Sequence, residues 1–315
     1  MLNTTHISID EVVKGVDKDS YYVIKGAFPG AVIDQIEREL NLWQFPLNEN
    51  DVHAVAIRHG AYFSHALAKS PTLFEAMTDP FILTLSRASL GDDFRLKCHR
   101  VYSVYPGMDQ PWHTDNKAHG LKESRLEGLV FITYFKDVED GELQILRGSH
   151  KWNENYTYSI FDEDVINERY ADLISSIKAP RGTMIIYDAK AVHRAKPIQS
   201  KRWHRTSLFF QVDSYSGDGE KILLDAAFLK DLTPEVCQFL GFGKPSTYPT
   251  APSDTSLATL LPSQLLDVQK SLVTAFAATS MRGAIDMIPR AFRHRLQHWF
   301  GKKVAWNTTF NSKTE

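Results

Sequence analysis

Cysteine is scarce in this chain, since only Cys98 and Cys237 occur among its 315 residues. Two cysteines cannot form the disulfide framework of small secreted proteins, so a reducing compartment is expected. No apolar run approaches the roughly 20 residues that span a bilayer. The first 15 residues also lack the basic start and apolar core of a signal peptide. We therefore expect a cytoplasmic protein, with contact at a membrane surface left open.

Strong net charge is lacking as well. The 36 basic and 38 acidic residues give a formal charge of -2, which excludes a general attraction to nucleic acid or anionic membranes. The other proportions, 43% hydrophobic and 11% aromatic, are those of an ordinary globular protein. A chain of this length buries a sizeable core without disulfides or structural metals.

The first 90 residues carry mainly helical patterns. Tyr21–Ile24 is expected to form a short strand, and residues 29–43 an amphipathic helix with apolar residues at three- and four-residue spacing. Residues 64–90 hold further helical patterns, which we expect Pro71 and Pro80 to interrupt.

The pattern then changes to short strands rich in aromatic and β-branched residues. Gly, Pro and Asp turns separate them, and most have no helix-length connection between them, which favours an antiparallel sandwich or barrel. With the helices, the fold class is α+β. The expected strands are Phe94–Tyr105, Gly128–Val138, Gly141–Leu146, Thr183–Asp188 and Thr206–Val212.

A candidate iron site follows from three residues. A non-haem iron centre that activates O2 needs two imidazoles and one carboxylate on one face. His113 and Asp115 point the same way on an extended segment, because alternate side chains share a face. His193 follows the strand-like TMIIYD 80 positions later. Alone, a His-x-Asp triplet is weak evidence in a chain with twelve histidines, but the order of strand, triplet, strands and single His favours ligation.

A basic residue begins the next strand and completes the set. Arg205 lies twelve residues after His193. The far carboxylate of 2-oxoglutarate would need a guanidinium fork deep in the pocket, and Arg205 is the residue expected to supply it. Arg202 and His204 lie nearby and remain alternatives for this role. The structural alternative is that Arg205 merely extends from a strand edge into solvent.

At this point the chain resembles the phytanoyl-CoA dioxygenase family of Fe(II)- and 2-oxoglutarate-dependent oxygenases. The resemblance runs from about Tyr21 to Ser214. It rests on the segments WHTDN (112–116), GELQILRGSHK (141–151), PRGTMIIYDAKAVHRA (180–195) and YYVIKGAFPGAVIDQIEREL (21–40). The GELQILRGSH segment is the most specific of these, because a chance metal triad would not include it.

The resemblance implies a double-stranded β-helix, a cupin-like jelly-roll barrel with flanking helices. It implies Fe(II) on His113, Asp115 and His193, with 2-oxoglutarate and O2 as co-substrates and Arg205 binding 2-oxoglutarate. Further co-substrate contacts are predicted for Lys97, Thr133 and Tyr134, which lie on strands near the pocket. His150 is expected in a structural turn rather than as a ligand. The chain departs from the family pattern at Ala195, where a small hydroxyl residue is usual, and at His204, where the arginine commonly falls.

The resemblance also implies the reaction. Halogenating relatives lack the carboxylate that Asp115 provides, so hydroxylation of an aliphatic C–H bond is expected, with release of succinate and CO2. The substrate is expected to be a small or lipid-like metabolite. The alternative is a non-catalytic jelly-roll protein that binds a ligand. A nucleic-acid demethylase would need a basic groove, which the residues around the triad do not supply.

Three regions are expected along the chain: residues 1–240 as the oxygenase domain, 241–256 as a linker or long loop, and 257–315 as a helical C-terminal extension. Six basic residues and one acidic residue occur between Met281 and Phe310, with an apolar stripe at helical spacing. Such a basic amphipathic helix binds anionic membranes, acidic partners or phosphate-bearing substrates, or packs on the barrel. Residues 116–127 and 152–176 are expected to form lids over the pocket.

Overall fold

The computed structural model describes residues 2–40, 54–57, 60–63, 65–106, 110–115, 127–152, 160–200, 203–214 and 219–247. All of them belong to one compact unit, Met1–Asp254. The C-terminal extension, its basic helix, most of the linker and residues 116–126 of the first expected lid lie outside the described residues. Within the described part, no helix is long and apolar enough to cross a membrane.

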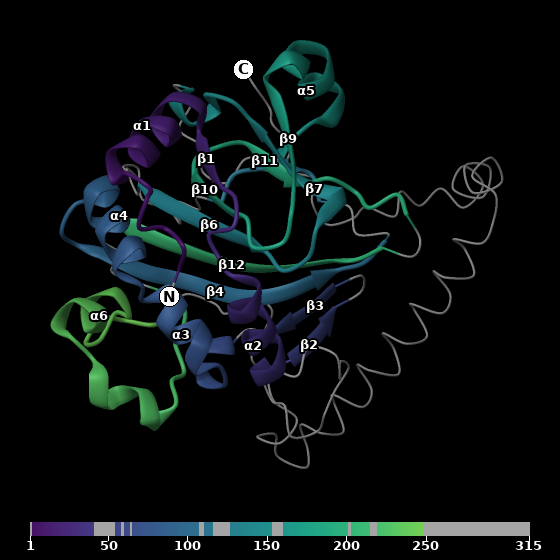
Figure 1. Cartoon of the computed structure of the whole chain (residues 1–315). Coiled ribbons are helices and arrows are strands. Elements are labelled where there is room, and N and C mark those ends of the chain that lie inside the picture. The colour runs from purple at the N-terminus through teal and green to yellow at the C-terminus, as the bar shows by residue number, and fades with distance from the viewer. Residues whose placement is uncertain are drawn as a thin grey trace. The chain divides into compact units, whose positions relative to one another are not determined.

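Two antiparallel sheets form the centre of this unit (Figure 1). In the larger sheet the order is β1 (Tyr21–Ile24), β10 (Met184–Asp188), β6 (Gly128–Tyr134), β12 (Arg205–Ser214), β4 (Phe94–Val104), β3 (Gly60–Phe63) and β2 (Ala54–Ile57). In the smaller sheet it is β8 (Ile160–Phe161), β5 (Trp112–His113), β11 (His193–Ala195), β7 (Val138–Leu146) and β9 (Ile174–Ala179). The expected combination of helices with antiparallel strands is confirmed.

The central strands of the larger sheet, β10, β6 and β12, are buried on both faces, and their side chains alternate between two cores. On β6, Leu129 and Phe131 join a core shared with the helices, whereas Val130 and Ile132 join a core shared with β7 and β9 of the smaller sheet. We call these the helix-side core and the inter-sheet core. Side chains at alternate positions of a strand therefore face either the helices or the space between the sheets; we refer to this odd or even position as the residue's parity.

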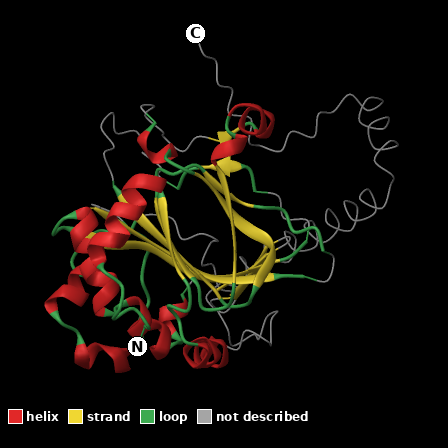
Figure 2. Cartoon of the chain, turned by 45° about the horizontal axis from the view of Figure 1, so that its top comes forward, coloured by secondary structure: helices red, strands yellow, loops and turns green. Residues whose placement is uncertain are grey.

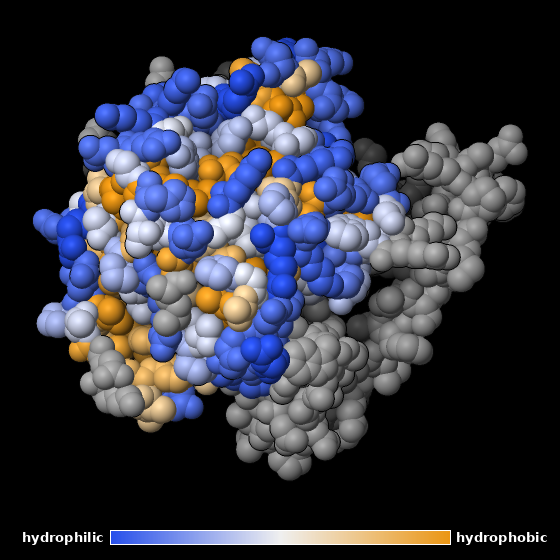
Figure 3. Space-filling view, in the orientation of Figure 1, coloured by the Kyte–Doolittle hydropathy of each residue, from blue (hydrophilic) through white to orange (hydrophobic). Residues whose placement is uncertain are grey.

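Most of the helices gather on one side of the strands (Figure 2). Those that contribute to the helix-side core are α1 (Ile9–Asp19), α2 (Gly30–Leu40), α3 (Pro71–Met77), α4 (Pro80–Leu90) and α6 (Pro234–Phe239). A sixth helix, α5 (Glu163–Arg169), lies in the second segment expected as a lid. Where α1 lies, the outward surface is mainly hydrophilic (Figure 3), in keeping with a helix that buries Val12 and Val16.

Pro71 and Pro80 begin helices rather than interrupt one. Each stands in the first turn, where the missing N–H costs no hydrogen bond. The side chains of Ser70 and Asp79 cap the two helices by accepting from Leu73 N at 3.0 Å and Phe81 N at 3.0 Å.

Several predicted strands occur with nearly the expected bounds, β1 among them. The strand expected over Gly128–Val138 instead ends at Tyr134, and Val138 begins the next strand, β7.

Candidate metal centre

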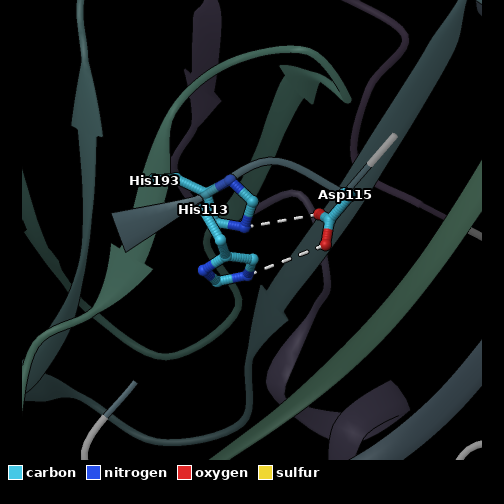
Figure 4. A group of neighbouring side chains, drawn as sticks. All are labelled: His113, Asp115 and His193. Carbon is cyan, nitrogen blue, oxygen red and sulfur yellow. Dashed lines mark ion pairs between the residues drawn. The ribbon is translucent and has the colours of Figure 1, made fainter. Parts of the chain in front are cut away.

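Two neighbouring strands of the smaller sheet bring the predicted iron ligands together. His113 on β5 and His193 on β11 are register partners, and Asp115 follows β5 by two residues. One ligand atom from each residue lies within 4.8 Å of the others. Asp115 Oδ1 is 3.9 Å from His113 Nε2, and its Oδ2 is 3.3 Å from His193 Nε2. Figure 4 shows the three side chains pointing toward one another.

Backbone carbonyls set the tautomer of both imidazoles. His113 Nδ1 donates to Pro111 O at 2.8 Å, and His193 Nδ1 donates to Ala191 O at 3.0 Å. Because a carbonyl oxygen only accepts, each Nδ1 carries the proton and each Nε2 presents a lone pair. Both Nε2 atoms therefore face Asp115 as ready metal ligands, with ring orientations already fixed by the outer hydrogen bonds.

Tyr187 on β10 supports the carboxylate. Its hydroxyl donates to Asp115 Oδ2 at 2.8 Å and lies 3.2 Å from His193 Nε2. Burial alone would raise the pKa of Asp115, but His193, His113 and the bond from Tyr187 outweigh it, so the pKa lies below its usual value. Burial and the charge of Asp115 raise the pKa of Tyr187 well above its usual value, so the phenol stays a donor.

Two neutral imidazoles and one ionised carboxylate on a single face are the donor set of a non-haem Fe(II) centre. The residues fit this metal by chemistry as well as by proximity, because the remaining directions open into a cavity instead of meeting a fourth protein ligand among the described residues.

The cavity lies between the two sheets and has a volume of about 250 Å³. Arg205, at the start of β12, lines it together with the triad. The guanidinium is buried, donates to Gly141 O, and lies 5.8 Å from the centre of the Tyr102 ring. Its Nε has no hydrogen-bond partner among the described residues, so a donor remains for a ligand carboxylate.

Lys97, Thr133 and Tyr134 do not line this cavity, and the co-substrate contacts expected of them stay predictions. Thr133 has the opposite parity from Ile132 on β6 and therefore faces the helix side. The Tyr134 hydroxyl donates to Ile177 O and accepts from Leu143 N, each at 3.0 Å, so it joins the two sheets. Lys97 Nζ instead pairs with Asp213 Oδ2 at 2.9 Å.

The alternatives to these ligands have other contacts. His204 faces Lys136 Nζ at 2.5 Å and stacks on Tyr105, and Arg202 lies outside the described residues. His150 Nδ1 bonds Ser20 Oγ at 2.7 Å, away from the triad.

The residue before His150 has a role that the sequence did not reveal. Ser149 Oγ accepts from Val192 N and donates to Leu146 O, each at 2.8 Å, and so holds the residue next to His193. In the GELQILRGSH segment, the serine therefore supports a metal ligand.

Further side chains line the cavity that sequence reasoning missed. Gln110 lies 3.1 Å from His113 Nε2 through its Nε2 and accepts from Ala195 N at 3.3 Å. Arg100, Gln211 and Tyr187 come from β4, β12 and β10. The only signal for them was strand alternation, which needs the register before it identifies a face.

The chain is similar to known proteins. The phytanoyl-CoA dioxygenase (PhyH) family model matches residues 16–207. Dioxygenase olcK of Penicillium canescens is 22% identical over 260 residues, which cover 76% of this chain and 82% of that protein. Among solved structures, HygX from Streptomyces hygroscopicus with nickel and 2-oxoglutarate bound matches with a TM-score of 0.48 and 16% identity, over 64% of this chain and 85% of that one.

The family match covers more than half of the chain and includes all three metal-ligand candidates and Arg205. The chain therefore belongs to the phytanoyl-CoA dioxygenase family and is a 2-oxoglutarate-dependent iron dioxygenase.

Proposed function

We propose that this dioxygenase hydroxylates an aliphatic C–H bond of a small-molecule or lipid-like substrate and releases succinate and CO2. In this proposal the two sheets are the halves of a jelly-roll barrel, with His113, Asp115 and His193 holding Fe(II) inside it. The observation that carries the proposal is the convergence of two Nε2 lone pairs and one carboxylate within 4.8 Å at the wall of a cavity.

Arg205 is the proposed anchor for the co-substrate. A guanidinium binds a carboxylate through two parallel N–H donors, and the buried setting strengthens that pairing. The donor to Gly141 O holds one side of the fork in place, and the free Nε leaves another N–H for 2-oxoglutarate. With the far carboxylate there, the keto-acid end points along the cavity toward the triad.

Bound Fe(II) supplies O2 activation coupled to oxidative decarboxylation of 2-oxoglutarate. The protein's own residues orient the metal ligands and exclude water from the site. Carbonyls hold both imidazoles, Tyr187 holds the carboxylate, and the walls contributed by Ile132, Leu143 and Phe209 exclude water from the reacting C–H bond. Because Asp115 keeps the carboxylate that halogenating relatives lack, the proposed outcome is hydroxylation.

An anaerobic titration tests the iron and co-substrate sites. Fe(II) and 2-oxoglutarate added to the wild-type chain should produce the weak visible charge-transfer band of the chelate. The band should be lost in His113→Ala and kept in His6→Ala, a histidine on the surface. A folded wild-type protein that gives no band with metal present would refute the proposal and favour a non-catalytic ligand-binding barrel.

The proposed hydroxylation is tested by identifying a product. A screen of small and lipid-like compounds with the loaded enzyme, read by mass spectrometry, should reveal a substrate that gains one oxygen atom as succinate forms. Desaturation, which removes two hydrogens instead, would keep the iron and co-substrate sites but refute the proposed outcome.

A further inference from the structure

A bulge between two strands of the larger sheet creates a buried polar cluster beside the cavity. On β12, Gln211 pairs with Cys98, but the next residue, Val212, pairs with Leu96. Lys97 is the extra residue, and a bulge turns two successive side chains of one strand toward the same face. Lys97 and Cys98 therefore both face the inter-sheet space, where Cys98 lines the cavity and Lys97 reaches Asp213.

The cluster is a fully buried ion pair with one amide attached. Lys97 Nζ and Asp213 Oδ2 are 2.9 Å apart, with side chains 5% and 0% exposed. Gln211 Nε2 donates to Asp213 Oδ1 at 2.7 Å. Gly128 leaves room for this carboxylate, since a Cβ there would lie 2.5 Å from Asp213 Oδ1. Desolvation of two charges makes such a pair a poor source of stability, which favours a positional role for it.

That role concerns the direction of the Gln211 amide. An ionised carboxylate only accepts, so the amide must present its NH2 group to Asp213 and its carbonyl oxygen to the opposite side. Gln211 lines the cavity, whereas Asp213 does not. Among the described residues, no donor is bonded to this carbonyl oxygen, which leaves an acceptor at the cavity wall.

Gln211 lies at the metal end of the cavity. It pairs with Val130 on β6, and Val130 pairs with Tyr187 on β10, so Gln211 and Tyr187 lie in one row across the sheet. Arg205 lies six residues earlier on β12, about 20 Å away along the strand. The anchor of the co-substrate and the acceptor of Gln211 therefore belong to opposite ends of the cavity.

Formal charges around the cavity favour an uncharged ligand at this end. Of the charged side chains that line the cavity, Arg100 and Arg205 are matched by Asp115 and by the buried Glu220, whose charge acts on Arg100, and Lys97 is paired with Asp213. Fe(II) and the 2-oxoglutarate dianion also balance each other. The loaded site therefore has no formal charge left for an ionic substrate group to neutralise.

We propose that Gln211 is a specificity-determining residue that accepts a hydrogen bond from a hydroxyl group of an uncharged substrate. The inference rests on the proposed function and deepens it by naming the substrate class: a neutral, mainly apolar alcohol whose hydroxyl bonds Gln211 Oε1 while a nearby C–H bond faces the metal. The ion pair of Lys97 and Asp213 keeps the acceptor aimed at the cavity.

Three small probes that share one ring test this proposal: cyclohexanol, methoxycyclohexane and cyclohexanecarboxylate. The full chain is loaded with 2-oxoglutarate and redox-inert Zn(II), and probe affinities are measured by saturation-transfer NMR titration. Cyclohexanol should bind about three- to tenfold more tightly than its methyl ether, the range expected for one neutral hydrogen bond. The carboxylate should bind most weakly.

Variants assign the preference to the residue. Gln211→Met keeps the length of the side chain and removes the acceptor, so the preference for alcohol over ether should disappear. Gln199→Met changes an exposed glutamine and should keep it. Should Gln211→Met fail to fold, the wild-type preference for the alcohol over the ether still tests the proposal.

Several outcomes would overturn the inference: no preference for the alcohol in the wild type, including no binding of either probe, or a preference that survives in Gln211→Met. Tightest binding of the carboxylate would assign specificity to Arg100 and an anionic substrate instead. These failures are distinguishable from failure of the proposed function, because the Fe(II) and 2-oxoglutarate chelate band would still form in the wild type.

Discussion

Replacement of Tyr187 by phenylalanine removes one oxygen atom from the outer shell of the metal site and keeps the ring that fills the space. The lost hydroxyl donates to Asp115 Oδ2 at 2.8 Å and lies 3.2 Å from His193 Nε2. It is fully buried between the sheets. Because the ring remains, the change tests a hydrogen bond with little effect on packing.

The expected effect is weaker metal binding. A hydrogen bond to a charged group contributes about 1.5–3 kcal/mol, and loss of an outer partner of a metal ligand typically costs about 10- to 100-fold in affinity. The longer contact with His193 involves a neutral acceptor and contributes less to the free energy than the bond to Asp115. We therefore expect Fe(II) affinity about tenfold below wild type at pH 7.5.

The deficit should be the same at pH 6 as at pH 7.5. The Tyr187 bond is only one of the influences that hold the pKa of Asp115 below its usual value, and those of His193 and His113 remain without it. The carboxylate therefore stays deprotonated, as metal binding requires, at both pH values. The ratio between wild-type and variant affinities should not change between them.

Anaerobic calorimetric titration with Fe(II) measures the affinity at both pH values, and Tyr134→Phe is the matched control. Tyr134 is an equally buried tyrosine that does not line the cavity, and its hydroxyl bonds Ile177 O and Leu143 N. That variant should unfold at a lower temperature and bind Fe(II) as wild type does. Wild-type affinity in Tyr187→Phe at both pH values, or equal losses in the two variants, would refute the reasoning.

Three further changes separate other parts of the structure. Ser149→Ala removes the bonds that hold Val192 and should lower the free energy of unfolding by about 1–3 kcal/mol and weaken Fe(II) binding, whereas the exposed Ser200→Ala should do neither, as denaturation and titration would show. Arg205→Lys replaces a fork by a point charge and should weaken 2-oxoglutarate binding about tenfold with unchanged Fe(II) affinity, measured from the chelate band. Burial, and after it the charge of His65, lowers the pKa of His99 to about 3, below its unfolded value. The contribution of His99 to the free energy of unfolding should therefore be complete above pH 6.5 and fall by up to about 1.4 kcal/mol per pH unit below it. Urea unfolding of His99→Gln should show a flatter dependence on pH.

The long strands could be predicted from the sequence because their residues are apolar or β-branched along their length. The bounds of β1 match the expectation, and β10 and β12 differ from it by one or two residues at an end. The strands β5, β8 and β11 have only two or three residues each and were missed. Their pairing joins positions 80 residues apart, as between His113 and His193, and no local pattern encodes it.

The site was predictable where residue type alone restricts chemistry. Two histidines, an aspartate and an arginine in the right order were enough to name the triad and Arg205. Lys97, Thr133 and Tyr134 were chosen for lying on strands near the pocket, but the face of a strand depends on register. A bulge directs Lys97 to Asp213, and parity directs Thr133 to the helices.

The two ends of the cavity are held by different means, and this has a consequence for evolution of the enzyme. Backbone carbonyls of Pro111, Ala191 and Gly141 hold the two imidazoles and the guanidinium, so these groups depend on the path of the chain. At the Gln211 end, the amide of Gln211 is held by the side chain of Asp213, which is paired with the side chain of Lys97. Backbone contacts persist through most substitutions, whereas side-chain contacts change with one. Substrate preference can therefore change at Gln211 and its partners while Fe(II) and 2-oxoglutarate binding are retained, so chelate formation and substrate choice should vary independently in variants of this chain.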